Sequence, residues 1–555
     1  MNLALLALGV LALLVSGYRL YGRWLGRQFG LDDARATPAH VKADGVDFVP
    51  TKPFYLFAQH FSAIAAAGPI AGPILACQNF GWLPCVLWIT LGVISIGAVH
   101  DFSSLIASVR HGGCSIAEIA RERLGTPAGR AFMAFIWIAL IYVIVAFTDI
   151  TAGSFVSGTE ELQGESVRFN AGGAVAAASV MYLGLAVLMG IVQRFLAPPL
   201  WLMTLIFVPA TFALSWLGTH VSEVLVFDAR TWALAILGYC AVASVVPVWA
   251  LLQPRGYLGG FVLYSALALG VVGIVFGGYE LKQPAFATFD TGKSSGQLFP
   301  FLFVTIACGA CSGFHGLVCS GTTSKQVERE SHAHFVGYGA MLAEAFVALI
   351  ALVTVAICTN EQLAGLAPGK IYGNGIGEFM TLVIGPEHKK FAITFGAMAF
   401  STFVFDTLDV ATRLGRYLVQ ELLGWRGFAG AAFGTFATIA PAAAFLWFSD
   451  KGSFLKFWTL FGASNQLLAA LTLLSIAVWL KSEGRRTAFV VVPLVFLLVI
   501  TLWALGSIAW VSFSGARGLD VAFANGSTAA LLMALALFLS ARAARALRPS
   551  GARAG

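Results

Sequence analysis

Long apolar stretches, separated by short polar connections, follow one another along the whole chain. Most of them are near the 20 residues that an α-helix needs to cross the hydrocarbon core of a membrane. The pattern predicts about fifteen spanning helices, near residues 2–19, 54–78, 82–109, 130–150, 171–191, 198–218, 230–253, 256–278, 298–322, 334–358, 390–412, 427–448, 456–480, 488–511 and 524–541. The predicted fold is therefore that of an all-α polytopic membrane protein.

Composition and charge agree with this pattern. The chain is 58% hydrophobic and 11% charged, which leaves too little polar surface for a soluble protein of 555 residues. Most of the 34 Lys and Arg residues fall on alternate connections, as at Arg19/Arg23/Arg27 and Lys481/Arg485/Arg486. The positive-inside rule then predicts an external N-terminus and a cytoplasmic C-terminus. The net charge of +7 needs no nucleic-acid partner, and the first stretch is predicted to be a retained span, because its arginines follow it.

The second apolar stretch contains an interruption, Gly68-Pro69-Ile70-Ala71-Gly72-Pro73. Proline lacks an N–H and clashes with the preceding turn, and glycine disfavours a helix. Interrupted membrane helices hold the binding sites of many secondary transporters. We predict that Gly68, Pro69, Gly72 and Pro73 bind substrate; the alternative is a simple proline kink.

Ionisable side chains at membrane depth are costly and mark functional sites. In the predicted spans they are His60, His100, Asp101, His315, Glu344, Asp406 and Asp409. We predict that all of these except Glu344 take part in ion coupling, together with the hydroxyl of Ser312. The alternative for each is an ordinary hydrogen bond between helices.

A second proline-containing segment runs from Val246 to Arg255. Pro247 and Pro254 are predicted to interrupt the seventh span, with Pro247 and Trp249 contacting substrate; alternatively they only end a helix. Two groups of five spans, 54–218 and 230–426, would then each begin with a broken helix and run in opposite directions, as in an inverted repeat. Residues 1–53 and 427–555 would lie outside this core.

Several other classes of function lack their motifs. The chain has no G-x-x-x-x-G-K-[ST] phosphate loop and no H-E-x-x-H zinc motif. Cys308 and Cys311 form a C-x-x-C without a partner pair, which favours packing over metal binding. We predict no cofactor, no metal and no enzymatic activity, and infer transport driven by a gradient.

Several motifs resemble the carbon starvation protein CstA family. They are HFSAIAAAGPIAGP at 60–73, GAVHDF at 97–102, SGFH at 312–315, SGTTSKQ at 320–326, LDVATRLGR at 408–416 and FGASNQLL at 461–468. The resemblance implies a LeuT-like core of five plus five helices, in the bacterial inner membrane, with additional helices at both ends. It also implies import of pyruvate, with protons as the coupling ion, or of peptides during nutrient limitation. His100 stands where glutamine is expected.

The predicted mechanism is alternating access. Backbone N–H groups at 68–73 would bind the substrate carboxylate, since the N-terminal ends of helices are partly positive. Ser312 would face a cation, or His60 or Asp101 would take a proton. The alternatives from other classes are an uncoupled channel and a membrane sensor.

Overall fold

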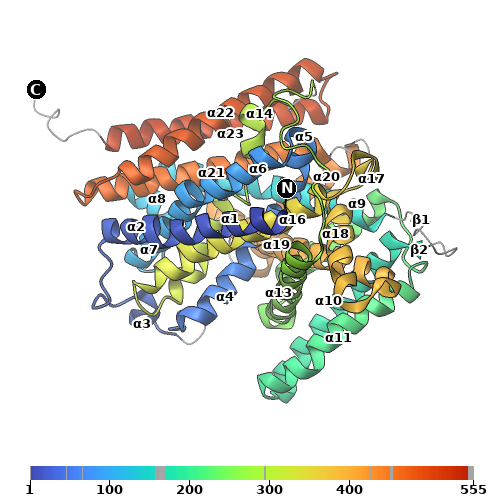
Figure 1. The fold of residues 1–555 in the computed structure, drawn as a ribbon. Coiled ribbons are helices and arrows are strands. Elements are labelled where there is room, and N and C mark those ends of the chain that lie inside the picture. Colours follow the sequence, from blue (N-terminus) through green and yellow to red (C-terminus); the bar gives the residue numbers. More distant parts are fainter. Residues whose placement is uncertain are drawn as a thin grey trace, which may run out of the picture.

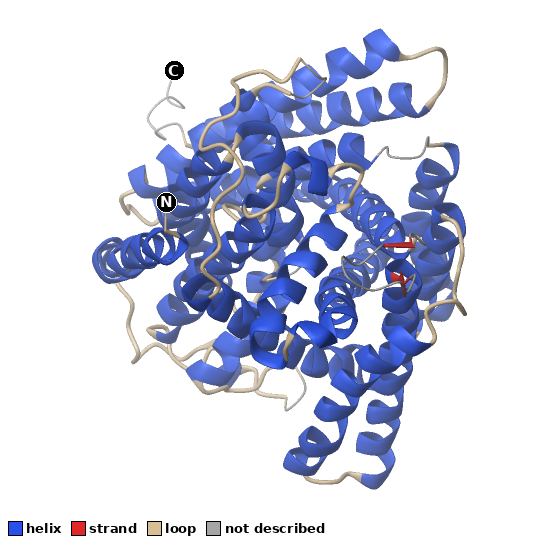
Figure 2. Ribbon diagram, turned by 45° about the vertical axis from the view of Figure 1, so that its right-hand side comes forward, coloured by secondary structure: helices blue, strands red, loops and turns tan. Residues whose placement is uncertain are grey.

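The structure is a computed structural model that describes residues 2–44, 47–65, 67–156, 159–160, 169–292, 296–425, 427–449 and 454–547. Helices dominate this part of the chain (Figure 2). Two short strands, β1 (Thr159–Glu160) and β2 (Phe169–Asn170), form an antiparallel ribbon in which Thr159 pairs with Asn170.

The helices follow one another in chain order (Figure 1): α1 (Leu3–Gly17), α2 (Arg23–Phe29), α3 (Pro38–Val41), α4 (Pro53–Ile64), α5 (Gly68–Phe80), α6 (Trp82–Leu87), α7 (Ala98–Arg110), α8 (Ile116–Leu124), α9 (Thr126–Phe155), α10 (Ala171–Leu196), α11 (Leu200–His220), α12 (Ala229–Val245), α13 (Leu252–Phe276), α14 (Leu298–Thr305), α15 (Gly313–Gly321), α16 (Ala340–Ala356), α17 (Asn360–Leu363), α18 (Pro368–Ile384), α19 (Lys389–Leu423), α20 (Gly427–Phe448), α21 (Phe454–Ser482), α22 (Ala488–Gly515) and α23 (Val521–Ala546). Three π-helical segments extend them: Tyr18–Gly22 joins α1 to α2, Trp88–Gly97 joins α6 to α7, and His334–Gly339 leads into α16.

In the described part of the chain, 12 helices are long and apolar enough to cross a membrane. The bent pair α4 and α5 makes 13. Two of the predicted spans fall short of this length: α12 has 17 residues, and the predicted span 298–322 is divided into α14 and α15. The multi-pass helical membrane fold is therefore confirmed, and the count of about fifteen stays a prediction.

Burial differs strongly between the helices. The spans of α9, α16, α19 and α21 are mostly buried by other helices, whereas less than a third of the spans that contain α1, α11, α20 and α23 is buried. In water such exposed faces would be unfavourable, but lipid tails are as apolar as leucine side chains. The first group therefore forms the centre of the protein, and the second group meets lipid.

The first interruption lies where the Gly/Pro pattern predicts it. Helix α4 ends at Ile64, α5 begins at Gly68, and their axes differ by 47°. Pro69 occupies the first turn of α5, where its missing N–H costs no helical hydrogen bond.

The second interruption is not at Pro247 and Pro254. Helix α12 runs without a break to Val245, Pro247 lies in the connection after it, and Pro254 lies in the first turn of α13. The prolines therefore sit between two helices, and the prediction of a broken seventh span is wrong. The second interruption instead separates α14 from α15, at residues 306–312.

An ionic cluster, formed by Glu330, Arg35 and Arg110, fixes the connection after α2 to the connection before α16. Arg35 Nη1 lies 2.7 Å from Glu330 Oε1, and Arg110 donates from Nε and Nη2 to the two carboxylate oxygens at 3.1 and 3.0 Å. The backbone N–H of Asp32 also donates to Glu330, at 3.1 Å. Burial raises the pKa of Glu330, but the hydrogen bonds from Arg110, Arg35 and Asp32 outweigh it, so this pKa lies below its usual value of 4.5.

Candidate functional site

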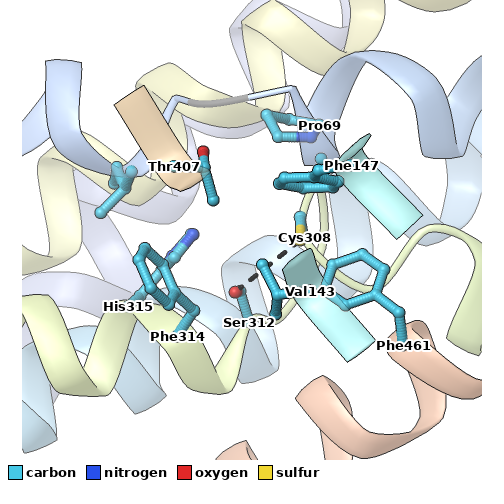
Figure 3. A pocket seen from close by; sticks show the side chains of 11 residues that line it. Pro69, Val143, Phe147, Cys308, Ser312, Phe314, His315, Thr407 and Phe461 are labelled. Atoms are coloured by element: carbon cyan, nitrogen blue, oxygen red, sulfur yellow. Dashed lines mark hydrogen bonds between the residues drawn. The ribbon is translucent and has the colours of Figure 1, made fainter. Parts of the chain in front are cut away.

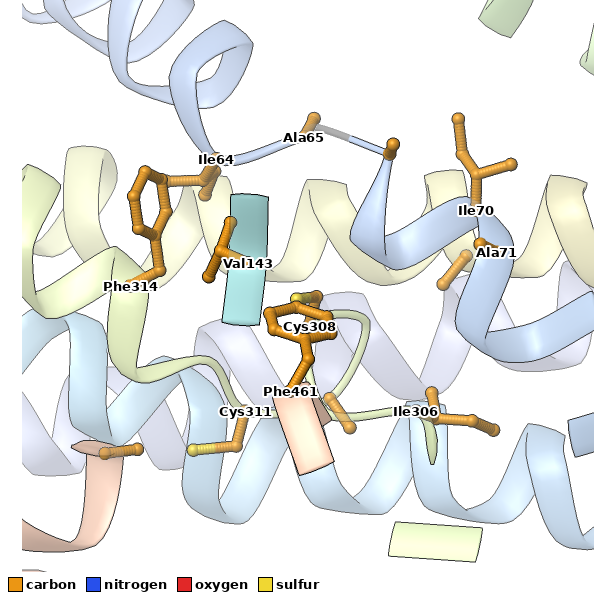
Figure 4. Packing of buried hydrophobic residues seen from close by; sticks show 14 of the residues in the cluster. Ile64, Ala65, Ile70, Ala71, Val143, Ile306, Cys308, Cys311, Phe314 and Phe461 are labelled. Atoms are coloured by element: carbon orange, nitrogen blue, oxygen red, sulfur yellow. The ribbon is translucent and has the colours of Figure 1, made fainter. Parts of the chain in front are cut away.

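The two interruptions lie against each other. A Cβ atom on Gly68 would be 2.4 Å from Cys308 Sγ, and one on Gly72 would be 2.6 Å from the carbonyl oxygen of Thr305. Figure 4 shows α5, with Ile70 and Ala71, passing over the loop that carries Ile306 and Cys308. Glycine allows this approach because it has no side chain. The two glycines thus let α5 pack closely on the second interruption, Gly68 against the side chain of Cys308 and Gly72 against the main chain of Thr305 and Ile306.

Other helices approach the second interruption in the same way. A Cβ on Gly97 would be 2.2 Å from the carbonyl oxygen of Ala310, and one on Gly462 of α21 would be 1.9 Å from that of Val304. The loop between α14 and α15 is therefore surrounded by other backbone segments rather than by lipid.

Side chains of α21 satisfy the polar groups that this loop exposes. Asn465 accepts from the backbone N–H of Phe314 at 2.9 Å, and its amide donates to Ser312 Oγ at 3.0 Å and to Cys308 Sγ at 3.2 Å. Trp458 Nε1 donates to the carbonyl oxygen of Thr305 at 3.1 Å. These bonds supply what an interrupted helix lacks at membrane depth. Asn465 and Trp458 were absent from the predicted site, although their polar groups stand out in an apolar helix.

A small cavity lies where the interruptions meet α9, α19 and α21 (Figure 3). Its volume is about 20 Å³, roughly the room that one water molecule requires. Its walls are Ile64, Gly68, Pro69, Val143, Phe147, Cys308, Ser312, Phe314, His315, Thr407 and Phe461. Of the predicted substrate-binding residues, Gly68 and Pro69 line it, while Gly72 and Pro73 are buried in the following turn of α5. A solute larger than water requires the surrounding helices to move apart.

Four buried ionisable side chains form a continuous chain beside the cavity, here called the histidine–carboxylate chain. His100 Nδ1 lies 2.7 Å from Asp101 Oδ1, and Asp101 Oδ2 lies 2.9 Å from His315 Nδ1. His315 Nε2 lies 3.4 Å from Glu344 Oε2. All four side chains are at most 1% exposed. The structure thus brings together His100, Asp101 and His315, three of the residues that the sequence nominated separately for ion coupling, and adds Glu344.

The histidine–carboxylate chain must bind protons to limit its buried negative charge. Two carboxylates beside neutral imidazoles would leave two negative charges buried in a membrane protein, which is strongly unfavourable. An imidazole has two nitrogens and so can receive a proton on one side and release it on the other. The arrangement is therefore able to hold protons and to pass them between α7 and α15 along the hydrogen bond from His315 to Asp101, with Glu344 of α16 within ion-pair distance.

His60 lies beside this chain and not in it. Its Nδ1 is 2.9 Å from Thr323 Oγ1, and its Nε2 is 3.9 Å from Cys319 Sγ. Cys319 in turn donates to the backbone carbonyl of Asp101 at 3.4 Å. The side chain of His60 and the backbone of Asp101 thus contact the same cysteine.

Asp406 and Asp409 belong to a different cluster. Both bind the guanidinium of Arg255, which is completely buried in the first turn of α13. Tyr239 completes this group, here called the Arg255 cluster, by donating to Asp409 Oδ2 at 2.8 Å. Asp406 and Asp409 therefore lie apart from the other predicted ion-coupling residues, and Arg255, one residue before the predicted span 256–278, was missed.

Pro247 and Trp249 lie away from the cavity. Both are exposed in the connection between α12 and α13, and the guanidinium carbon of Arg194 lies 5.8 Å from the centre of the Trp249 ring. Substrate contact by these two residues stays a prediction.

Comparisons with known proteins identify a family to which this chain is similar. The profile of the family described as carbon starvation protein CstA matches residues 1–374 and 363–504. The peptide transporter CstA of Campylobacter jejuni is 34% identical over 573 aligned positions, which cover 90% of this chain and 79% of that protein. The pyruvate/proton symporter BtsT of Escherichia coli is 32% identical, with 88% and 79% covered.

Among solved structures, the manganese transporter of Eremococcus coleocola aligns with a TM-score of 0.47 and 12% identity, over 88% of this chain and 95% of that one. The match to the family profile spans most of the chain, and the sequence relatives are transporters. This chain belongs to the carbon starvation protein CstA family.

Proposed function

We propose that this protein imports a small carboxylate such as pyruvate, by proton symport, across the bacterial inner membrane during carbon limitation. The position of His315 carries the proposal. This side chain lines the cavity at the two interruptions, and it binds Asp101 of the histidine–carboxylate chain. Coupling requires that substrate and proton act on a shared group, because a ligand shifts an equilibrium only through its own interactions.

The membrane arrangement that we propose has fifteen spans, with the N-terminus outside and the C-terminus in the cytoplasm. The short helix α12 and the pair α14/α15 supply the spans that length alone does not identify. Arg19, Arg23 and Arg27 then fall on the cytoplasmic side, as do Lys481 and Arg485.

The core is an inverted repeat in this proposal, but its division differs from 54–218 and 230–426. Each repeat begins with an interrupted helix, α4/α5 or α14/α15. Each continues with a helix that contains a π-helical segment, then a shorter helix, α8 or α18, and then a long one, α9 or α19. The long helices α9 and α19 pack against each other. Helices α10 and α11 would be an insertion in the first repeat.

Two helix N-termini supply attraction for a carboxylate at the cavity. Helix α5 begins at Gly68 and α15 begins at Gly313, next to the cavity residues Ser312 and Phe314. The N-terminal end of a helix carries a partial positive charge and favours anions. Ser312 offers a hydroxyl beside it, and Gly72 and Pro73 would hold α5 in place.

The histidine–carboxylate chain supplies the proton. In the proposed cycle, His315 is protonated while the anionic substrate occupies the cavity, so the two charges compensate each other. Release of the proton through Asp101, His100 or Glu344 then weakens substrate binding on the cytoplasmic side. His60, near the end of α4, accepts or donates a proton beside Cys319 of α15.

Peptide import is the second candidate, because relatives with 32 to 34% identity are named peptide transporters. A peptide has a carboxylate that the same helix ends can bind, but it requires a wider opening of the cavity. An uncoupled channel is the third, and it would move substrate only down its gradient.

Reconstituted protein separates these functions. We expect labelled pyruvate to accumulate in proteoliposomes under an inward proton gradient, with inhibition by excess pyruvate and not by dipeptides. Accumulation of a labelled dipeptide instead would establish peptide transport, and equilibration without accumulation would establish a channel.

A variant pair tests the role of His315. His315→Gln keeps a polar side chain but cannot carry a charge, and we expect it to lose gradient-driven accumulation while retaining exchange of substrate. The control is His220→Gln, because His220 lies exposed at the end of α11. Equal accumulation by the His315 variant and the wild type would refute the proposed coupling.

A further inference from the structure

The Arg255 cluster joins three helices inside the membrane-spanning region. Arg255 of α13 donates to Asp406 Oδ1 from Nε at 3.0 Å and from Nη2 at 2.5 Å. Its Nη1 donates to the Tyr239 hydroxyl at 2.6 Å and also to Asp409 Oδ2. Asp406 and Asp409 belong to α19, and Tyr239 belongs to α12.

The charges in this cluster do not balance. One guanidinium faces two carboxylates, which leaves one negative charge when both carboxylates are ionised. The other titratable and charged groups that face the pair are Tyr239 and Cys240 on α12, Tyr182 on α10 and Arg413 on α19.

None of these groups supplies a second positive contact. Tyr182 donates to the backbone carbonyl of Arg255, and Arg413 donates from Nη2 to the carbonyl oxygens of Ala243 and Val246 at 2.6 and 2.8 Å. An uncompensated buried charge is strongly unfavourable, so the cluster requires a further cation. A proton is the simplest cation that fits, since one of the two carboxylates can bind it directly.

The carboxylates of Asp406 and Asp409 differ in their exposure to solvent and in the groups that donate hydrogen bonds to them. The side chain of Asp409 is 2% exposed, and both Arg255 and Tyr239 donate to its Oδ2. The side chain of Asp406 is 20% exposed, and Arg255 occupies only its Oδ1. A Cβ atom at Gly259 would be 3.0 Å from Asp406 Oδ2, so glycine leaves room beside this oxygen.

We propose that Asp406 is a second site for a transported proton, separate from the histidine–carboxylate chain. Asp409 and Arg255 form the permanent ion pair, and the proton leaves water to bond to Oδ2 of Asp406, which neutralises the surplus charge. No other covalent bond changes in this step. The inference rests on the proposed proton symport and adds a second proton to it.

The position of Thr407 connects this site to the cavity. Thr407 lies next to Asp406 in α19 and lines the cavity, as His315 does. Ionisation of Asp406 changes its attraction to Arg255, and with it the hold of α13 on this turn of α19. The protonation of Asp406 therefore acts on the cavity through Thr407, whereas the histidine–carboxylate chain acts on it through His315.

Infrared spectroscopy tests the proton without any substrate. A protonated carboxylic acid has a carbonyl stretch that an ionised carboxylate lacks. In pH-difference spectra of the full-length protein in lipid, we expect a band of this kind that Asp406→Asn removes and Asp406→Glu shifts. The control Asp149→Asn, which changes a half-buried acid of α9, should leave that band in place. Spectra of the two Asp406 variants that match the wild type would overturn the proposal.

Transport measurements then test whether this proton moves with substrate. With the membrane potential clamped at zero and a gradient of one pH unit, each coupled proton multiplies the accumulation ratio by about ten. We expect Asp406→Asn to lower this ratio about tenfold while exchange of substrate continues. An unchanged ratio would overturn the second coupled proton. If the wild type accumulates no substrate, the proposed function itself fails, and the infrared result still decides whether Asp406 binds a proton.

Discussion

Replacing Gly72 by alanine adds one methyl group at the point where the two interruptions touch. The new Cβ would lie 2.6 Å from the Thr305 carbonyl oxygen and 3.3 Å from Ile306 Cα, and real Cβ contacts essentially never fall below 3.0 Å. Both obstacles are backbone atoms, so no change of rotamer relieves the contact. At Gly68 the obstacles belong to the Cys308 side chain, and a change of rotamer there moves Sγ, at 2.4 Å, but not Cβ, at 2.6 Å. Helix α5 or the loop at 305–306 must therefore shift by about 0.4 Å or more to reach that limit.

The expected change in folding stability for Gly72→Ala is the balance of two opposing effects. Overpacking of this kind destabilises by about 1–3 kcal/mol, and alanine favours a helix over glycine by up to about 1 kcal/mol. We expect a net loss of about 1–2 kcal/mol, which changes an equilibrium by a factor of about 5–30. Gly184→Ala is the matched control, because no atom lies within 4 Å of its added Cβ and only the helix-favouring effect remains.

The assay is the apparent melting temperature of the protein in detergent, followed by substrate exchange in proteoliposomes. Gly72→Ala should lower both the melting temperature and the rate of substrate exchange. Gly184→Ala should raise the melting temperature slightly or leave it unchanged. Equal melting temperatures for the two variants would show that the interruptions do not pack as described.

Two further predictions concern stability. Asn465→Ala leaves the backbone N–H of Phe314 without its acceptor, and we expect a loss of about 1–3 kcal/mol, measured as a lower melting temperature that Asn465→Gln does not restore. Glu330→Gln removes a carboxylate whose pKa lies below its usual value of 4.5. Ionised Glu330 therefore stabilises the protein above pH 4.5, and this stabilisation disappears as the pH falls through the lowered pKa. Because the side chain of Arg35 is 44% exposed, we expect Arg110 to supply most of the stabilisation, and the variant to lose about 1–2 kcal/mol of folding stability at neutral pH. If the melting temperatures of variant and wild type still differ below the lowered pKa, the ionic role is contradicted.

The sequence predicts the first interruption and not the second, for a physical reason. Pro69 and Pro73 mark the first one locally, since proline limits a helix whatever surrounds it. The second one contains no proline, and it depends on hydrogen bonds from Asn465 and Trp458, which lie about 150 residues away along the chain. Pro254 led to the prediction of a break where none exists, because the sequence alone does not distinguish a proline in the first turn of a helix from a proline inside a broken helix.

The site was predictable to a similar extent. His100, Asp101 and His315 stand out one by one, because ionisable groups at membrane depth are costly, but the sequence did not show that they contact one another. Asp406 and Asp409 have the same residue type and depth, but the pattern cannot show that Arg255 is their partner. Only the packing of α13 against α19 brings that guanidinium to them.

The cluster around Glu330 has a consequence for synthesis of the protein. Arg35 and Glu330 are 295 residues apart in the chain, and ribosomes add about 5–20 residues per second, so Arg35 waits roughly 15–60 s for its partner. Arg485, which donates to the carbonyl of Phe29, arrives later still. The first span therefore enters the membrane long before the contacts that hold its C-terminal end exist, and its final docking is an event of late assembly.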